Sequence, residues 1–137
     1  MQGLCHDRHH PCINIRSKLS PTDYLLLPMI IIRNRFLPPT PHHIAINLFG
    51  ILFVKRNAHL TPALINHERI HTAQMRELIF IFFYILYIAE WLFRLVLCRG
   101  DYMSAYRNTS FEREAYLHDH NLSYLSKRPA FAQWRKT

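Results

Sequence analysis

The chain has 137 residues, of which half are hydrophobic, and 17 Lys and Arg against 9 Asp and Glu give it a net charge of +8. This length fits a single domain, and the apolar content is sufficient for a core without disulfide bonds. The basic residues are scattered among apolar segments and accompany no DNA- or RNA-binding motif, so nucleic acid is not the expected partner. Anionic lipid or simple solubility explains the positive charge better.

Residues 1–28 are predicted to be a flexible N-terminal tail, or a segment upstream of a true start at Met29. Prolines and polar residues oppose regular structure there, and the Cys and His residues at 5–12 lack a second ligand pair at zinc-finger spacing. An odd number of cysteines, one of them inside an apolar run, favours reduced thiols and a cytosol-facing site. We identify no cleaved targeting peptide, because Pro28 interrupts the apolar residues and no small-residue cleavage site follows.

Residues 29–137 are predicted to form one domain, and its first part is predicted to be β-structure. The run "LLLPMIII" followed by "RNRF" predicts a short strand or an apolar anchor, and "PPTPHH" at 38–43 predicts a turn-rich linker. In "HIAINLFGILFVK", two β-rich runs meet near Gly50 and predict either a hairpin or one bent strand.

The rest of the chain is predicted to be helical. Thr61 and Pro62 are typical of a helix start, and residues 63–98 contain neither Gly nor Pro, so they predict one helix or two. "DYMSAYRN" predicts a short helix, and Ser110 is expected to cap a last helix that runs to about Ser126. The expected fold class is therefore α+β and predominantly helical.

The stretch "ALINHERIHTAQ" places His67, Glu68 and His71 in the pattern H-E-x-x-H near the start of the long helical stretch. Residues four apart lie on one face of a helix, so both histidines can offer an imidazole nitrogen to one tetrahedral zinc ion. Glu68 is angled beside the metal and is placed to take a proton from water and pass it to a leaving amine. The alternative is an exposed polar turn at the start of a core helix.

A catalytic zinc ion needs a third protein ligand, and a carboxylate is a usual one. Glu77 lies six residues after His71, too far round the same helix to reach that metal, and Glu90 is farther still. Glu112 lies in the first turn of the predicted last helix, where the helix dipole stabilises a carboxylate, and we select it as the third ligand. Glu114 points about 200° away from Glu112, so only one of the two can serve, and either acid could simply be solvated. The other downstream candidates are Asp101, His118, Asp119 and His120.

The combination of H-E-x-x-H with a later E-x-x-A resembles the zinc endopeptidases that use a glutamate ligand, especially the membrane-embedded ones related to the CAAX prenyl protease. Aligning Ala115 with the alanine of that family's E-x-x-A-D implies that Glu112 completes a metal site with His67 and His71, and that Glu68 is the catalytic base. The resemblance also implies a zincin-like (gluzincin-like) domain, Zn²⁺ as cofactor and a peptide or protein as substrate.

The chain departs from this family at Tyr116, where the family has an aspartate that orients a zinc-binding histidine. Asp119, one turn further on, and the Tyr116 hydroxyl are the candidate substitutes. The longer pattern "AINLFG", "INHERIH" and "AYRNTSFEREAY" also resembles a group of small bacterial HExxH proteins over about residues 29–135. That second resemblance implies a bacterial protein but no particular activity.

Residues 78–97, "LIFIFFYILYIAEWLFRLVL", are long enough to cross a bilayer. Glu90 and Arg94 form an i, i+4 pair within this run, and charges at that depth need protein or water around them. One face of this run is predicted to meet protein, because amphipathic residues recur on it at steps of three or four: Tyr84, Tyr87, Trp91 and Arg94. The alternative is a buried core helix with aromatic packing.

The position of Glu112 limits how this apolar run can fold. A straight helix from His71 to Cys98 would carry the chain about 40 Å away, and the segment from Cys98 to Glu112 returns at most about 46 Å when fully extended. If Glu112 meets the two histidines, the helix must bend or break between about Met75 and Phe83. The expected fold is then a small β-hairpin, a helix that carries the motif, an apolar helix folded back on it, and a C-terminal helix with the third ligand.

A hairpin of apolar helices in or on a bilayer is compatible with this geometry. Lys127, Arg128, Arg135 and Lys136 are expected to contact anionic lipid. If residues 78–97 crossed the membrane in one pass instead, the two halves of the proposed site would lie on opposite sides.

The sequence therefore predicts a membrane-associated zinc metallopeptidase, at the bacterial inner membrane or, alternatively, in the cytoplasm. The strand in "FGILFVK" is expected to hold an extended peptide by edge pairing. One alternative is a catalytically inactive membrane-associated protein whose H-E-x-x-H is vestigial or holds structural zinc. A second alternative is a basic module that binds lipid or nucleic acid.

Overall fold

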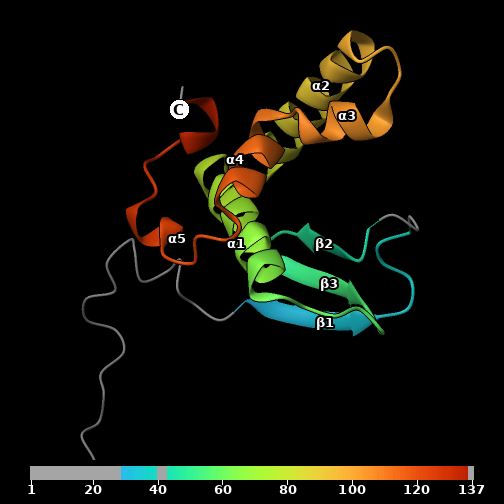
Figure 1. Cartoon of the computed structure of the whole chain (residues 1–137), viewed down its shortest axis with the longest axis vertical. Coiled ribbons are helices and arrows are strands. Elements are labelled where there is room, and N and C mark those ends of the chain that lie inside the picture. The colour runs from blue at the N-terminus through green and yellow to red at the C-terminus, as the bar shows by residue number, and fades with distance from the viewer. Residues whose placement is uncertain (1–28, 40–42, 136–137) are drawn as a thin grey trace, which may run out of the picture.

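The structure, a computed structural model, describes residues 29–39 and 43–135. The predicted tail at 1–28 and Lys136 lie outside the described residues. Within these ranges, three strands precede five α-helices and a short 3-10 helix, which confirms the predicted α+β, predominantly helical class (Figure 1). The elements are β1 (Ile30–Asn34), β2 (Ala45–Leu48), β3 (Ile51–Lys55), α1 (Pro62–Glu77), α2 (Ile81–Leu97), α3 (Tyr102–Arg107), α4 (Ser110–His118), α5 (Tyr124–Lys127) and η2 (Ala132–Trp134).

The sheet has the order β1-β3-β2, with β3 parallel to β1 and antiparallel to β2. Residues 30–34 form a strand and not an apolar anchor. The two runs around Gly50 form a hairpin and not one bent strand. The expectation that the strand in "FGILFVK" offers an edge to a peptide is wrong, because β3 is central and pairs on both sides. In the described sheet, the outer edges belong to β1 and β2.

The hairpin turn between β2 and β3 is docked onto the helices. Phe49 and Gly50 form a two-residue loop, and both have positive φ angles, of 53° and 84°. Positive φ at both positions is what a type I′ hairpin turn requires. The Phe49 ring lies 5.2 Å from the Tyr84 ring, centroid to centroid, and the Phe49 N–H donates a 2.9 Å hydrogen bond to the Tyr84 hydroxyl. The turn is thereby fixed against α2.

The long helical stretch is broken between Met75 and Phe83, as the position of Glu112 predicts. α1 ends at Glu77, α2 begins at Ile81, and the two helices are bent by 111°. Ile79 and Phe80 between them have left-handed backbone angles, with φ of 50° and 51°. The Phe80 N–H donates to the Met75 carbonyl (2.7 Å), the 6→1 bond of a Schellman helix end. The break therefore closes like a normal helix terminus although no Gly marks it.

The predicted last helix is shorter than expected, and its predicted cap is wrong by one residue. Thr109, not Ser110, is the N-cap, and its side chain accepts from the Glu112 N–H. α4 ends at His118 because the Asn66 side-chain amide donates to the carbonyl oxygens of His118, Asp119 and Asn121. These bonds replace the continued helical ladder, so the chain turns and forms α5 separately.

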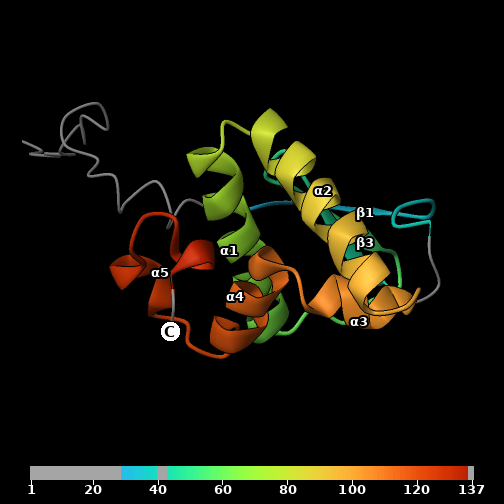
Figure 2. The ribbon, with the colours of Figure 1, turned by 90° about the horizontal axis from the view of Figure 1, so that it is seen from above.

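α1 and α4 pack side by side, and the apolar core lies along their contact (Figures 1 and 2). One cluster joins Ile70, Ala73, Ala115 and Leu125; the second joins Met75, Leu78, Phe83 and Phe111. The second cluster contains residues from α1, α2 and α4, so burial of apolar surface there stabilises the bent arrangement.

α2 has two different faces. Its inner face, which includes Phe83, Tyr84, Tyr87 and Trp91, is turned toward the rest of the protein, and this confirms the predicted protein-facing side. We name the opposite side the outer face of α2: Ile81, Phe82, Ile85, Leu86, Leu92, Phe93, Val96 and Leu97, all exposed. Among the described helices, none alone is long and apolar enough to cross a bilayer; α1 and α2 pass that test only together, across their bend.

The backbone angle at Ile79 generates a stability prediction. A β-branched residue in the left-handed region costs about 1–2 kcal/mol, which Gly does not. Ile79→Gly is expected to raise the free energy of unfolding by about 1 kcal/mol, measured by denaturant titration. The control is Ile85→Gly, another exposed isoleucine but inside α2, which should lower it by about 1 kcal/mol. Destabilisation by both substitutions would contradict the break at Ile79.

Candidate metal centre

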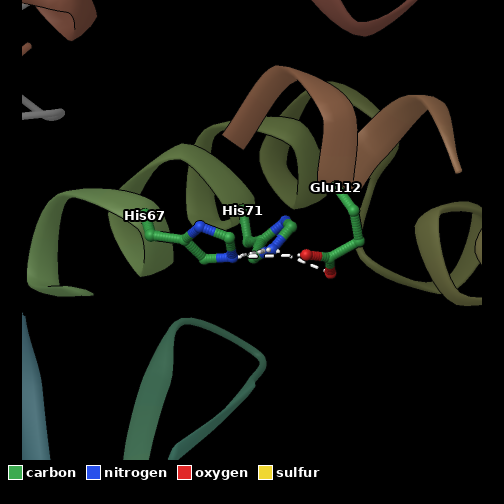
Figure 3. Close-up of side chains that lie close together, drawn as sticks. All are labelled: His67, His71 and Glu112. Carbon is green, nitrogen blue, oxygen red and sulfur yellow. Dashed lines mark hydrogen bonds and ion pairs between the residues drawn. The ribbon is translucent and has the colours of Figure 1, made fainter. Parts of the chain in front are cut away.

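His67 and His71 point from α1 toward Glu112 of α4 (Figure 3). The two Nε2 atoms are 3.1 Å apart. His67 Nε2 lies 3.3 Å from Glu112 Oε2, and His71 Nε2 lies 3.1 Å from Glu112 Oε1. All three side chains are buried. The structure thus brings together the three residues that the sequence predicts as ligands.

The spacing of these atoms fits a single ion. Ligand atoms bound at about 2.0–2.1 Å from one tetrahedral ion lie about 3.3 Å apart. One ligand atom from each of the three residues can be chosen so that all lie within 4.8 Å of one another. Two imidazoles and one carboxylate also leave a fourth tetrahedral position, which is the ligand number of catalytic rather than structural zinc sites. The group can therefore hold a metal ion.

The cluster stabilises positive charge at its centre. Burial disfavours a charged His71, but the Glu112 carboxylate and then Glu68 outweigh this and raise the pKa of His71 to about 9. Burial raises the pKa of Glu112, but the charge of His71 and the close contacts of the carboxylate with both imidazoles outweigh this and hold the pKa well below its usual range. A proton or a metal cation satisfies the same electrostatic demand, so the two compete for this position.

Glu112 is held in place from two sides. The Tyr87 hydroxyl of α2 donates to Glu112 Oε1 (2.7 Å), and Thr109 caps the turn that carries Glu112. Burial and then the negative charge of Glu112 raise the pKa of the Tyr87 and Tyr106 hydroxyls, so both stay protonated. Glu112 Oε2 is buried and accepts no hydrogen bond from any described residue, which leaves it available to a cation.

Glu68 lines a cavity beside the cluster but is not part of the metal group. The Asn47 side-chain amide on β2 donates to the Glu68 carbonyl (2.7 Å) and to Thr72 Oγ1 (2.8 Å), so this turn of α1 is fixed against the sheet. Burial raises the pKa of Glu68 against the lowering influence of His71 and His67. A raised pKa suits a carboxylate that accepts a proton and later returns it.

The cavity measures about 450 Å³ and extends between β2 and α2. His71, Glu68 and Glu112 are on its wall, and so are the four residues of β2. Most of the remaining lining is aromatic or aliphatic, with Phe83, Tyr84 and Trp91 from the inner face of α2. Such an apolar cavity with a few convergent polar groups is the usual form of a small-molecule or peptide site.

Glu77 and Glu114 belong to a second buried group, not to the metal cluster. Arg128 binds both carboxylates, and its side chain is only 3% exposed. Glu114 also accepts a hydrogen bond from the Tyr124 hydroxyl (3.0 Å). The alternative that Glu114 is a solvated acid is therefore wrong, and so is the expectation that Arg128 contacts lipid.

The remaining candidates lie outside the cluster. Glu90 accepts from the backbone N–H (2.9 Å) and hydroxyl (2.6 Å) of Ser110 and so ties α2 to the start of α4. Asp101 caps α3 through the Ser104 N–H. The metal group of the described residues includes none of the later candidates His118, Asp119 and His120.

In the zinc endopeptidases that the sequence resembles, an aspartate orients a zinc-binding histidine, and neither candidate for this role contacts His67 or His71 through its oxygen; Asp119 Oδ1 instead lies 3.6 Å from His120 Nε2. Asp119 Oδ1 is buried and accepts no hydrogen bond from the described residues. Tyr116 contributes its ring, which meets the His67 ring edge-on with centroids 4.7 Å apart. His71 does have a side-chain partner on the ring nitrogen that faces away from the cluster: its Nδ1 lies 2.8 Å from Gln74 Oε1.

Sequence reasoning missed Asn47 and Gln74, and it identified Tyr87 only as a protein-facing residue. Gln74 had a usable signal, because it follows His71 by three residues and therefore lies beside it on the helix surface. Asn47 had none, since its contact with α1 depends on how the hairpin docks.

Comparisons of this chain with protein-family models, with curated proteins and with solved structures gave no match. The resemblance to zinc endopeptidases therefore stays a prediction, and it is the geometry of the cluster and the cavity that bears on function.

The cluster geometry predicts one bound metal ion per chain. Glu112→Ala removes an oxygen ligand and should lower the zinc affinity at least about a hundredfold, measured by competition with a chromophoric chelator. Asp101→Ala, an acid that caps α3 away from the cluster, is the control and should bind zinc like the unmodified chain. Equal zinc affinity of the two variants would show that Glu112 is not a ligand.

Proposed function

We propose that this protein is a membrane-associated zinc metallopeptidase. The observation that carries the proposal is the convergence of His67, His71 and Glu112 on one point, with Glu68 opening onto the cavity beside it. The sequence motif supplies the first two ligands, and the fold-back of α4 supplies the third. A vestigial motif would have no need of a matching carboxylate from another helix.

The donor set favours a transition metal over calcium and magnesium, and the H-E-x-x-H motif on α1 favours zinc among the transition metals. Two imidazole nitrogens with one carboxylate oxygen suit zinc, whereas calcium and magnesium prefer oxygen ligands alone. A zinc ion in this position would supply Lewis-acid polarisation of a carbonyl and make a water molecule more acidic.

Glu68 is the proposed general base and acid. Glu68 lines the cavity together with His71 and Glu112, and its carboxyl group interacts electrostatically with both, so it is placed to accept a proton from the attacking water. It then delivers that proton to the amine that leaves when the peptide bond breaks. Asn47 fixes the backbone of Glu68, which limits the movement of this carboxylate relative to the substrate.

The substrate is proposed to be an extended peptide bound along β2. β2 is an edge strand of the described sheet, and residues Ala45 to Leu48 form part of the cavity wall. A peptide can add to such an edge through backbone hydrogen bonds, while its alternate side chains enter the cavity. The aromatic lining from α2 favours large apolar side chains at that position.

Glu68→Gln tests the catalytic role directly. The substitution keeps the size of the side chain but removes its proton-accepting capacity, so peptide hydrolysis should fall at least about a thousandfold while zinc remains bound. Hydrolysis of a peptide library with large apolar residues is the assay, and zinc content is measured on the same samples. If the unmodified zinc-loaded chain cleaves no peptide, the protein binds metal but is inactive. Tyr116 favours that alternative, because the zinc endopeptidases that the sequence resembles have an aspartate at this position.

The outer face of α2 is proposed to lie on a membrane. Its eight apolar side chains are exposed along the helix, while the inner face is covered by protein. Exposed Arg76 and Arg99 lie just before and after this region, where they can reach lipid headgroups. A net charge of +8 favours an anionic surface. Because the cavity is on the inner face, this placement leaves it clear of the lipid.

Membrane association is tested with vesicles of phosphatidylcholine and phosphatidylglycerol. Replacing Phe82 and Phe93 together by Asp removes two apolar contacts from the outer face and should weaken co-sedimentation by about tenfold or more. Replacing Phe36 and Leu117, exposed residues elsewhere, by Asp is the matched control and should leave binding unchanged. Equal effects of the two pairs would show that the outer face of α2 is not the membrane contact.

A further inference from the structure

Gln74 is a fully buried polar residue that the proposed chemistry does not use. Its side-chain amide lies among three polar groups. Oε1 is 2.8 Å from His71 Nδ1, and Nε2 is 3.0 Å from both the Phe111 carbonyl and Glu114 Oε2. The amide oxygen and the amide NH₂ group therefore both have hydrogen-bond partners.

The partners of Gln74 determine which way its amide is turned. A carbonyl and a carboxylate can only accept hydrogen bonds, so the NH₂ group must face Phe111 and Glu114. The amide oxygen must then face His71 Nδ1. Because that oxygen only accepts, His71 Nδ1 must carry a hydrogen, and the lone pair of the neutral ring is left on Nε2. Nε2 is the atom that faces His67 and Glu112.

Glu114 is itself fixed, so the amide of Gln74 cannot easily turn over. Arg128 donates to both Glu114 oxygens and to Glu77 at the end of α1. Tyr124 donates to Glu114 as well. The segment after α4 thereby fixes the Glu114 carboxylate. That carboxylate fixes the Gln74 amide, which in turn contacts the His71 imidazole.

We propose that Gln74 is a positioning residue of the metal centre, which sets the tautomer and ring orientation of His71 through its amide oxygen. This inference rests on the proposed metal site but not on catalysis. It also accounts for Tyr116, because the side-chain hydrogen bond that the family's aspartate would supply to a zinc-binding histidine comes here from α1 itself. The Arg128 group, which looks purely structural, then extends the support of the metal site to the C-terminal segment.

Gln74→Leu removes the acceptor behind His71 and keeps a similar volume. Zinc affinity, measured by competition with a chelator, should fall about 10–100-fold. The visible spectrum of the cobalt(II)-substituted chain should also change, because it reports ligand geometry. The matched control is Asn66→Leu, which removes another buried amide of α1 whose bonds go to the end of α4. That control should destabilise the fold yet leave zinc affinity within about threefold.

Gln74→Glu separates positioning from stability. A carboxylate at this position still accepts from His71 Nδ1–H, but it meets the acceptor-only Glu114 and Phe111, so the fold should be destabilised at least as much as by Gln74→Leu. Zinc affinity should nevertheless stay within about fivefold of the unmodified chain. Gln74→Glu is therefore expected to bind zinc more tightly than Gln74→Leu although its fold is no more stable.

The outcomes separate this inference from the proposed function. If the affinity of both Gln74 variants simply follows their stability, or if folded Gln74→Leu binds zinc like the unmodified chain, the positioning role is wrong and the peptidase proposal is untouched. If affinities follow the predicted order but no peptide is cleaved, the positioning role holds and the peptidase proposal fails. An unmodified chain that binds no zinc would overturn both.

Discussion

The contact of the Glu112 carboxylate with the two imidazoles of α1 is the constraint on which the architecture depends. These groups come from helices separated by the whole of α2 and α3, and they approach to 3.1–3.3 Å. The chain can achieve this only because α1 and α2 are bent by 111°. A continuous helix would place α4 far from His67 and His71. The cavity also depends on this return of the chain, because α2 and Glu112 form part of its wall.

Several independent contacts hold the bend. Left-handed backbone angles at Ile79 and Phe80 each cost about 1–2 kcal/mol, so the bend needs tertiary support. Phe83 and Phe111 pack together in one apolar cluster across the helices, with ring centroids 5.0 Å apart. Polar contacts from α2 add to this: Tyr87 reaches Glu112, and Glu90 caps the start of α4. The apolar helix is thus a structural element of the candidate metal centre as well as the candidate membrane contact.

The sequence was sufficient for the parts of the site that depend on local periodicity and chain length. The i, i+4 histidines had to share a helix face, and the position of Glu112 required a break between Met75 and Phe83 if the carboxylate was to reach them. The exact residues of the break were not predictable, because neither Gly nor Pro stands at Ile79 or Phe80 and packing alone selects them. The parallel pairing of β1 with β3, which makes β3 central, depends on a long-range contact that the pattern of either strand does not contain. The early end of α4 is likewise due to a distant side chain, Asn66.

The most direct test of the account is the anomalous scattering of zinc in crystals of the full chain grown with the metal. We expect one strong anomalous peak, about 2.0–2.2 Å from His67 Nε2, His71 Nε2 and a carboxylate oxygen of Glu112. A peak bound only by the two histidines, with the Glu112 carboxylate turned away from it, would contradict the central claim. So would a fully occupied zinc ion at a different position and none at this one.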